Sequence, residues 1–220
     1  VEQTERHGVY IVGYTDGTFG PSRSMTRAEA AAIFARLLAE KNGDTISTAA
    51  NTKFADIPAH AWYSGYVKYL SNNGITYGKS KTIFAPNDAI TRAEFTTMAV
   101  RFFDVYGDGD AEIMEQFSGF NDVSSGYWAA EYIKYAALHG WINGYGDGSF
   151  HADREINRAE VVTIVNRLLG READEDYIAD NLRKLNTFPD VSRKHWAYYA
   201  VMEAANAHTA VLGESESWSK

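Results

Sequence analysis

An arginine recurs three times in the chain, each time one residue after a Thr or Asn and two residues before a Glu. The pentapeptides are MTRAE, ITRAE and INRAE, and their arginines are Arg27, Arg92 and Arg158. A guanidinium binds a carboxylate through two parallel hydrogen bonds, and the free amides at a helix start also attract anions. The arginines therefore suit either an anionic ligand or a salt bridge to a neighbouring carboxylate. We expect Arg27→Ala or Arg158→Ala to weaken binding and leave thermal stability nearly unchanged; a loss of several kcal/mol would instead mark structural salt bridges.

The residues that flank each arginine predict the first turn of a helix. A good N-cap residue stands before each arginine, and a Glu follows the cap by three positions: Thr26 with Glu29, Thr91 with Glu94, and Asn157 with Glu160. This is the capping-box pattern, in which the cap side chain and the Glu side chain each satisfy a backbone amide. A cation in the first turn opposes the helix dipole, so the pattern explains the cap and the Glu but not the Arg.

A second motif, F-x-D-[IV]-x5-W, also occurs three times, as FADIPAHAW, FNDVSSGYW and FPDVSRKHW. Its aspartates are Asp56, Asp122 and Asp190, and its tryptophans are Trp62, Trp128 and Trp196. A Trp at the head of an amphipathic helix usually belongs to the core, but its face can also pack on a sugar ring. The aspartates suit turns or caps as well as ligand hydroxyls. Both interpretations stay open.

A Gly-rich loop precedes each pentapeptide: GYTDGTFGP (13–21), the irregular YGKSKTIFAP (77–86) and GYGDGSFHA (144–152). Three motifs in a fixed order define a repeat. The chain starts in the middle of one repeat and ends with a Trp-bearing segment that no loop follows. We therefore expect a closed, circularly permuted arrangement of three repeats. The expected segments are a first back half at 7–40, full repeats at 54–103 and 120–170, and a closing front half at 188–210.

Apolar residues recur with helical spacing after each arginine and again after each tryptophan. Each repeat is therefore predicted to be helix, loop, helix. We expect a mostly α fold over residues 1–220, a single domain with pseudo-threefold symmetry around a central three-helix bundle formed by the pentapeptide helices. The segment EADEDYIADNLRKL (172–185) is predicted to hold a short additional helix.

The composition excludes several classes of function. There is no cysteine, so disulfides and thiolate metal sites are absent, and the net charge of −8 disfavours nucleic acids and anionic membranes. The distinctive residues come in threes, which suits repeated binding better than one catalytic centre. No catalytic residue, metal or cofactor is expected; His7, His139 and His208 are assigned to helix ends. The segment DVYGDGDAEIME (104–115) partly matches a calcium loop, but a Tyr at its third position favours a polar connection.

The three motifs, in this order and spacing, resemble the S-layer homology (SLH) domain of bacterial cell-surface proteins. The resemblance implies three motifs in a pseudo-threefold bundle with ligand grooves between neighbours. It also implies an extracellular location in the bacterial cell wall or S-layer, as a monomeric anchor domain of a larger, secreted surface protein. The implied activity is non-covalent anchoring to secondary cell-wall polysaccharide, often with a pyruvate ketal on N-acetylmannosamine. No nucleic acid or membrane partner is implied.

The same resemblance assigns ligand-binding residues. It makes Arg27, Arg92 and Arg158 the anion ligands, Trp62, Trp128 and Trp196 groove aromatics, and Asp56, Asp122 and Asp190 hydroxyl acceptors. Gly13 with Tyr14 and Gly144 with Tyr145 would line two grooves, whereas the second loop departs from the pattern and offers Lys79 and Lys81. Two alternatives remain: a protein–protein assembly module of the cell surface, and binding of other peptidoglycan-linked groups.

Overall fold

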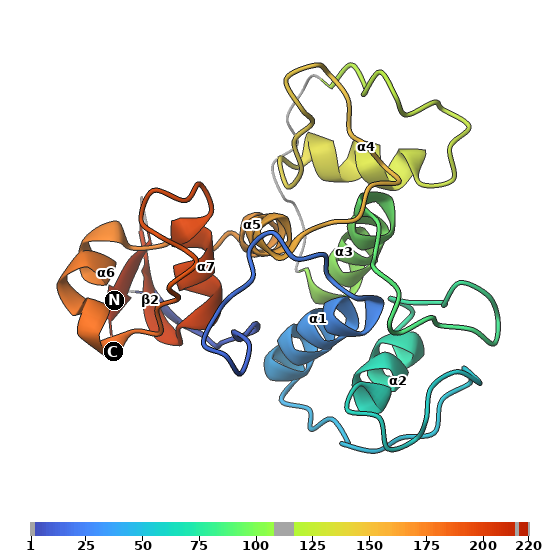
Figure 1. Ribbon diagram of the computed structural model, residues 1–220, viewed down its shortest axis with the longest axis horizontal. Helices are drawn as coiled ribbons and strands as arrows, with labels where there is room; N and C mark the ends of the chain where they lie inside the picture. Colours follow the sequence, from blue (N-terminus) through green and yellow to red (C-terminus); the bar gives the residue numbers. More distant parts are fainter. Residues whose placement is uncertain (1–2, 108–116, 214–215, 220) are drawn as a thin grey trace. The chain divides into compact units, whose positions relative to one another are not determined.

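The computed structural model of the protein describes residues 3–107, 117–213 and 216–219. This part of the chain is mostly helical, with three short strands (Figure 1). The helices are α1 (Arg27–Asn42), α2 (Ser64–Asn72), α3 (Arg92–Tyr106), α4 (Ala130–Leu138), α5 (Arg158–Leu169), α6 (Glu175–Asn181), the 3-10 helix η1 (Leu182–Lys184) and α7 (Tyr198–Ala205). The strands are β1 (Gln3–His7), β2 (His208–Leu212) and β3 (Ser217–Ser219). None of the described helices combines the length and the apolar character that crossing a bilayer requires.

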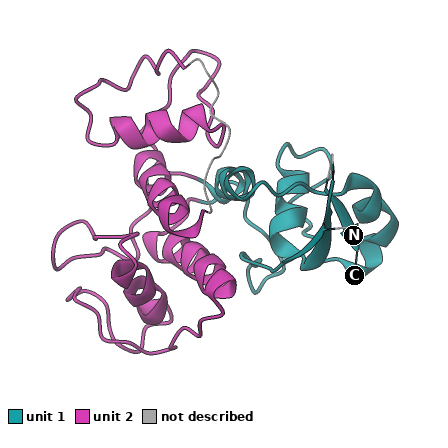
Figure 2. Ribbon diagram, turned by 180° about the vertical axis from the view of Figure 1, so that it is seen from behind, with its two compact units in different colours: residues 1–23, 157–220 teal, residues 24–156 magenta. Residues whose placement is uncertain are grey.

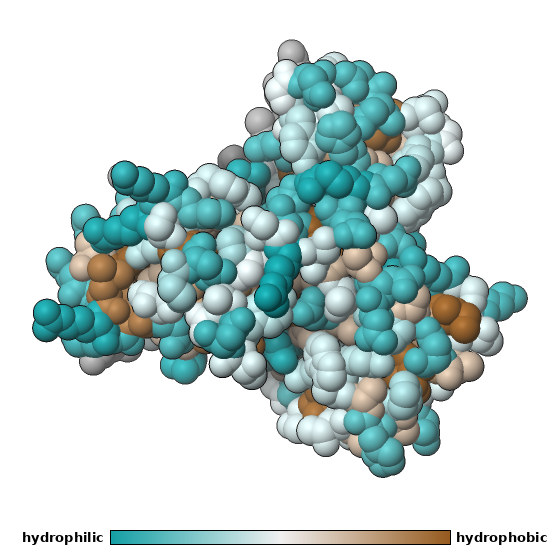
Figure 3. Space-filling view, viewed as in Figure 1, coloured by the Kyte–Doolittle hydropathy of each residue, from teal (hydrophilic) through white to brown (hydrophobic). Residues whose placement is uncertain are grey.

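The chain divides into two compact units (Figure 2). Unit 1 comprises residues 1–23 and 157–220, and unit 2 comprises residues 24–156. Unit 2 contains two helix pairs, α1 with α2 and α3 with α4, joined by contacts between α1 and α3. In unit 1, α5 packs on α7, and three strands form a small sheet. The face seen in Figure 3 is mainly hydrophilic, with hydrophobic residues in small separate patches.

All three pentapeptide helices begin as predicted. Thr26, Thr91 and Asn157 are the N-caps, and each forms a complete capping box with the Glu three residues later. Helices α1 and α5 end at glycines in the left-handed conformation, Gly43 and Gly170, which a residue with a Cβ adopts only with strain. The predicted helices after the tryptophans are α2, α4 and α7, and the short additional helix is α6 with η1. The helical prediction is confirmed, and the pseudo-threefold arrangement stays a prediction.

The core of unit 2 joins its two pentapeptide helices through aromatic rings. Phe34 of α1 lies against Phe95 and Phe102 of α3, with ring centroids 5.3 and 4.9 Å apart. All three side chains are buried. Aromatic pairs at such distances add to the stabilisation from the burial of their apolar area. The apolar stripe that predicted these helices is therefore the surface through which they pack.

Unit 1 contains a three-stranded antiparallel sheet that the sequence analysis did not predict. Strand β1 pairs with β2 from Gln3↔Leu212 to His7↔His208, and β2 pairs with β3. The strands are short, and the first pairing joins segments that are about two hundred residues apart in the sequence. Local periodicity carries no signal for such a contact. The prediction that His7 and His208 lie at helix ends was wrong, because both lie in paired strands.

Two other predictions concern His139 and the partial calcium loop. His139 is the C-cap residue of α4, so its predicted position at a helix end is confirmed. Most of the partial calcium loop at 104–115 lies outside the described residues.

Candidate functional site

Each Gly-rich loop is held by contacts among three residues at equivalent positions: the Asp of F-x-D, the Phe of the loop and the Arg of the pentapeptide. We call this set the loop clamp. In the clamp around Phe84, the Asp56 carboxylate accepts hydrogen bonds from the amides of Phe84 (2.9 Å) and Ala85 (2.6 Å). The Phe84 carbonyl accepts from Arg27 Nε at 2.7 Å. One aspartate and one arginine thus hold the two sides of a single peptide segment.

The other two repeats form the same clamp. Asp122 accepts from the amides of Phe150 and His151 at 2.7 Å each, and Arg92 Nε donates to the Phe150 carbonyl at 2.9 Å.

In unit 1, Asp190 accepts from the amides of Phe19 (2.9 Å) and Gly20 (2.7 Å), and Arg158 Nε donates to the Phe19 carbonyl at 2.8 Å. In each clamp the aspartate and the arginine both hydrogen-bond to the backbone of the loop. The two residues act on the same Phe from opposite sides.

The clamp holds the residue after each Phe in the left-handed region. Gly20, Ala85 and His151 have φ values of 68°, 59° and 54°. This conformation is easy for Gly but strained for Ala and His, at about 1–2 kcal/mol. The two amide hydrogen bonds to the aspartate offset that strain, because the left-handed turn aims both amides at one carboxylate.

The glycine near the start of each loop is required by packing. A Cβ on Gly13, Gly78 or Gly144 would lie 2.5 Å from a ring carbon of the F-x-D Phe: Phe188, Phe54 and Phe120, respectively. Gly78 therefore occupies in the second loop the position of Gly13 and Gly144. The second loop departs from the pattern in its side chains and its length but keeps this close approach.

Lys79 takes the place of the tyrosine in the second loop. Its amide donates to the Ile83 carbonyl at 2.8 Å, as the Tyr14 amide does to Thr18 (2.7 Å) and the Tyr145 amide to Ser149 (2.8 Å). The Lys79 ammonium forms an ion pair with Asp88 at 3.1 Å. The positive charge predicted for this loop is therefore partly neutralised by the loop itself.

The three arginines are buried, with exposed fractions of 4%, 5% and 4% for Arg27, Arg92 and Arg158. Arg92 lies over the rings of Phe150 (4.5 Å) and Tyr145 (5.2 Å). Arg158 lies over Phe19 and Tyr14, at 4.7 Å each. Cation–π contacts of this kind are stronger where water is excluded. The two tyrosines thus cover the guanidinium groups that they were predicted to accompany.

Further polar contacts hold the guanidinium groups. Arg92 Nη2 donates to the Asn143 carbonyl at 3.2 Å, and Arg158 Nη2 donates to the Val12 carbonyl at 2.6 Å. Arg27 Nη1 lies 3.2 Å from Glu94 Oε1, an ion pair with the capping-box Glu of the next repeat. Burial lowers the pKa of Arg27, and the carboxylates of Glu94, Asp88 and Asp56 counteract this shift. We therefore revise one expectation: Arg→Ala should reduce folding stability, because the loop carbonyl loses its donor.

The three F-x-D tryptophans are exposed, at 55%, 57% and 65% for Trp62, Trp128 and Trp196. The alternative that they belong to the core is wrong. Trp62 makes edge contacts with Tyr63 and Tyr66, and Trp196 stacks on His195 with ring centroids 5.7 Å apart. Each indole is supported from one side by the aromatic residues beside it in the chain and offers its remaining surface to solvent.

Tyr127, next to the exposed Trp128, is held by a carboxylate. The Tyr127 hydroxyl donates to Asp153 Oδ1 at 2.6 Å. Burial, then the hydrogen bond to Asp153, raises the pKa of Tyr127 to about 12, and the charge of Glu94 adds to this. Glu94 is the carboxylate paired with Arg27, and Tyr127 precedes the exposed Trp128. Trp128 therefore follows a tyrosine that is hydrogen-bonded to Asp153 and whose pKa also responds to the charge of Glu94.

Comparison with known proteins settles the family. The family model described as the S-layer homology domain matches residues 1–31, 53–96 and 119–162. The chain belongs to the S-layer homology family. The matched segments contain all three pentapeptide arginines and the first two F-x-D motifs. The SLH family places the chain at the bacterial cell surface.

Several surface proteins are similar to this SLH chain. Cell surface glycoprotein 1 of Acetivibrio thermocellus is 34% identical over 96% of this chain and 9% of its own length. The cellulosome-anchoring protein of the same organism is 31% identical over 96% of this chain and 45% of its own. The surface-layer 125 kDa protein of Lysinibacillus sphaericus is 32% identical over 72% of this chain and 13% of its own. The chain spans less than half the length of each.

The sequence analysis missed two groups of residues. The loop phenylalanines Phe19, Phe84 and Phe150 are the centre of every clamp, and their recurrence in each loop motif was the available signal. Tyr127 gave no such signal, because the equivalent positions hold Ala61 and His195. The predicted ligand roles of the Arg, Trp, Asp, Gly and Tyr residues stay predictions.

Proposed function

We propose that this SLH chain is a non-catalytic module that anchors a larger protein to the cell wall without a covalent bond. Its proposed ligand is an anionic secondary cell-wall polysaccharide, with a pyruvylated amino sugar as the charged group, bound in grooves between neighbouring repeats. The observation that carries the proposal is the repeated combination of a buried guanidinium and an exposed Trp on a chain with a net charge of −8. Such a chain needs local cations to attract an anion.

The contacts in unit 2 support this proposal at the level of atoms. Arg27 uses Nε for the loop carbonyl and turns Nη1 toward a carboxylate, Glu94. A ligand carboxylate is chemically equivalent to Glu94 and would share or replace that contact. The exposed face of Trp128 suits the apolar face of a pyranose ring, and Asp153 and Glu94 suit its hydroxyl groups. Charge and ring recognition together would distinguish an acidic sugar from a neutral one.

The proposal is tested by sedimentation with purified cell-wall sacculi in three forms. The first form is intact, the second has lost its ketal-linked pyruvate by mild acid, and the third has lost the whole secondary polysaccharide. We expect the chain to sediment with the intact form only. Equal sedimentation with all three would contradict polysaccharide binding and favour a protein or peptidoglycan partner. Sedimentation with the first two alone would keep the polysaccharide but exclude the pyruvate.

A further inference from the structure

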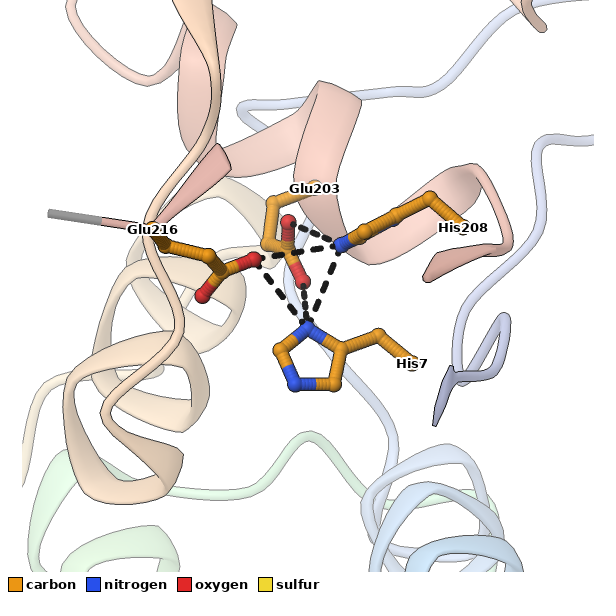
Figure 4. Close-up of side chains that lie close together, drawn as sticks. All are labelled: His7, Glu203, His208 and Glu216. Atoms are coloured by element: carbon orange, nitrogen blue, oxygen red, sulfur yellow. Dashed lines mark hydrogen bonds and ion pairs between the residues drawn. The ribbon is translucent and has the colours of Figure 1, made fainter. Parts of the chain in front are cut away.

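Unit 1 holds a buried cluster of four side chains of the kinds that bind metal ions: His7, Glu203, His208 and Glu216 (Figure 4). His7 ends β1, Glu203 lies on α7, His208 begins β2, and Glu216 immediately precedes β3. One donor atom from each residue lies within 4.8 Å of the others. The side chains are 4%, 0%, 2% and 5% exposed, respectively. The cluster shares no residue with the loop clamps or with the exposed tryptophans.

Several separations between the donor atoms are close to the edge length of a tetrahedron around one ion. His7 Nδ1 and His208 Nε2 are 3.2 Å apart, and each lies 3.3 Å from Glu216 Oε1. Glu203 Oε1 lies 3.4 Å from His7 Nδ1, and its other oxygen, Oε2, lies 3.3 Å from His208 Nε2. Zn²⁺ binds His and carboxylate ligands at about 2.0 Å, and four ligands at that radius in a tetrahedron are about 3.3 Å from one another. The chain thus places these atoms where one ion would hold them.

The histidines are oriented by partners on their outer nitrogens. His208 Nδ1 lies 2.9 Å from the Asn206 carbonyl, so this nitrogen carries the hydrogen and Nε2 turns its lone pair to the centre of the cluster. On His7, the outer nitrogen Nε2 faces Glu5 at 4.0 Å, and Nδ1 points inward. Metal-binding histidines commonly donate their second N–H to a carbonyl or carboxylate in this manner. The indole of Trp218 also stacks on His208, with ring centroids 3.8 Å apart.

The two carboxylates differ in a way that suits a metal. Glu216 is fixed in place, because Oε2 accepts from the Glu172 amide at 3.0 Å and Oε1 accepts from Trp218 Nε1 at 3.1 Å. Glu203 is fully buried and accepts no hydrogen bond within the described part of the chain; its oxygens face the two histidines at 3.4 and 3.3 Å. A buried carboxylate is strongly unfavourable unless a positive charge balances it, so Glu203 needs a cation beside it, either a metal ion or a protonated histidine.

We propose that His7, Glu203, His208 and Glu216 together bind one divalent transition-metal ion, with Zn²⁺ the ion that fits best. Two imidazoles and two carboxylates at tetrahedral spacing match Zn²⁺, whereas Ca²⁺ and Mg²⁺ take six or more oxygen ligands. All four positions are filled by the protein and closed to water, so the ion has a structural role. It ties β1 to the end of the chain that carries β2 and β3. This site is independent of the proposed polysaccharide binding.

A proton is the competing occupant of the cluster. Burial lowers the pKa of His7, but the contacts with Glu203 and Glu216 outweigh it and raise the pKa to about 9, while the nearby Arg171 opposes this rise. A protonated His7 and Arg171 could together balance the two carboxylates. The two occupants predict different stoichiometries of bound metal, so a direct measurement separates them.

The test is a metal titration of the full chain after dialysis against a chelator. We expect one Zn²⁺ per chain by calorimetry and by elemental analysis. Thermal stability should rise by about 5 °C once free Zn²⁺ exceeds its Kd about a hundredfold. Co²⁺ in the same site should show the intense visible absorption of a four-coordinate ion, a readout that needs no variant.

Two variants and a control complete the experiment. Glu203→Gln and His7→Gln should each lose the stoichiometric ion and the Co²⁺ spectrum, whereas His60→Gln, at an exposed histidine in unit 2, should retain both. Absence of stoichiometric binding to the unaltered chain would overturn the proposal in favour of the proton. Binding that persists in both cluster variants, or a preference for Ca²⁺, would overturn it as well.

Discussion

The exposed tryptophans and the buried arginines, which belong to two different motifs, have different roles in the fold. An arginine with its Nε on a loop carbonyl is part of the fold, and any ligand must share the guanidinium with the chain. An indole that is more than half exposed is not held by the fold in this way. Substitution of the tryptophans therefore separates binding from stability more cleanly than substitution of the arginines.

We expect Trp128→Ala to weaken sedimentation with intact sacculi while changing the free energy of unfolding by less than about 0.5 kcal/mol, because the side chain is 57% exposed. The matched control is Trp141→Ala, at a tryptophan that is 3% exposed. This change should lower the free energy of unfolding by about 3–5 kcal/mol. Chemical denaturation gives both values. A large loss of stability in Trp128→Ala would show that the indole serves the fold instead.

Glu94 provides a second test at the scale of a residue. Glu94→Gln keeps a capping-box side chain, because Gln also serves at this position, but removes the charge that neutralises Arg27. A pyruvylated fragment should then bind more tightly, by up to about fivefold, or ~1 kcal/mol. Calorimetry measures this, with the exposed Glu40→Gln as control. Weaker or unchanged binding would mean that Arg27 does not receive the anion.

Ala85 tests whether the clamp stores strain. With φ at 59°, the residue adopts a conformation that favours Gly, so Ala85→Gly should raise the free energy of unfolding by about 1 kcal/mol. Ala55→Gly, at a residue that is not in the left-handed region, should lower it slightly instead. Chemical denaturation compares the two. A loss of stability in Ala85→Gly would show that the left-handed turn does not strain Ala85.

At the scale of an element, the Gly-rich loop is held by the carboxylate that accepts hydrogen bonds from its backbone amides. Partial burial raises the pKa of Asp122, but the amides of Phe150 and His151 outweigh it, so the pKa lies below the ordinary value of 3.8. A carboxyl group with a lowered pKa stabilises the folded state above its unfolded pKa. That contribution disappears as the pH falls through the folded pKa.

Asp122→Asn should accordingly lower the free energy of unfolding by about 2 kcal/mol at pH 7, because a charged acceptor of two amides is lost. The difference from the unaltered chain should shrink as the pH falls below about 4. Melting temperatures between neutral and acidic pH measure this, with Asp180→Asn as a control for the loss of a surface carboxylate. A difference that stays constant with pH would contradict the proposed role of the charge.

The helices could be predicted from the sequence because their signals are local. Capping boxes and apolar stripes lie within one helix, and Thr26, Thr91 and Asn157 are all N-caps. The clamp could not be predicted, because the carbonyl that Arg27 holds belongs to Phe84, more than fifty residues later. The cluster of His7, Glu203, His208 and Glu216 was missed for the same reason, because strand pairing is what brings His7 next to His208. Residue types were visible in the sequence, but their partners depended on long-range pairing.

For the molecule as a whole, the net charge of −8 sets the response to salt. Each proposed groove offers one buried arginine, so salt screens its contact with an anion only partly. At the same time, salt reduces the general repulsion between an acidic chain and an acidic polysaccharide. We expect a tenfold rise in salt to change the dissociation constant by less than about tenfold, as measured with purified polysaccharide. A steep loss of affinity would indicate a diffuse electrostatic attachment.

The small sheet of unit 1 has a mechanical consequence for a module that must hold against a pull. A force applied at Gln3 along β1 acts parallel to the strand, and the hydrogen bonds from Gln3↔Leu212 to His7↔His208 then resist sliding together. A strand pulled across its neighbour would instead release them one at a time. The sheet therefore resists a force along β1 better than a force across it. An ion bound at the His7↔His208 end of this pairing would be the last contact to break.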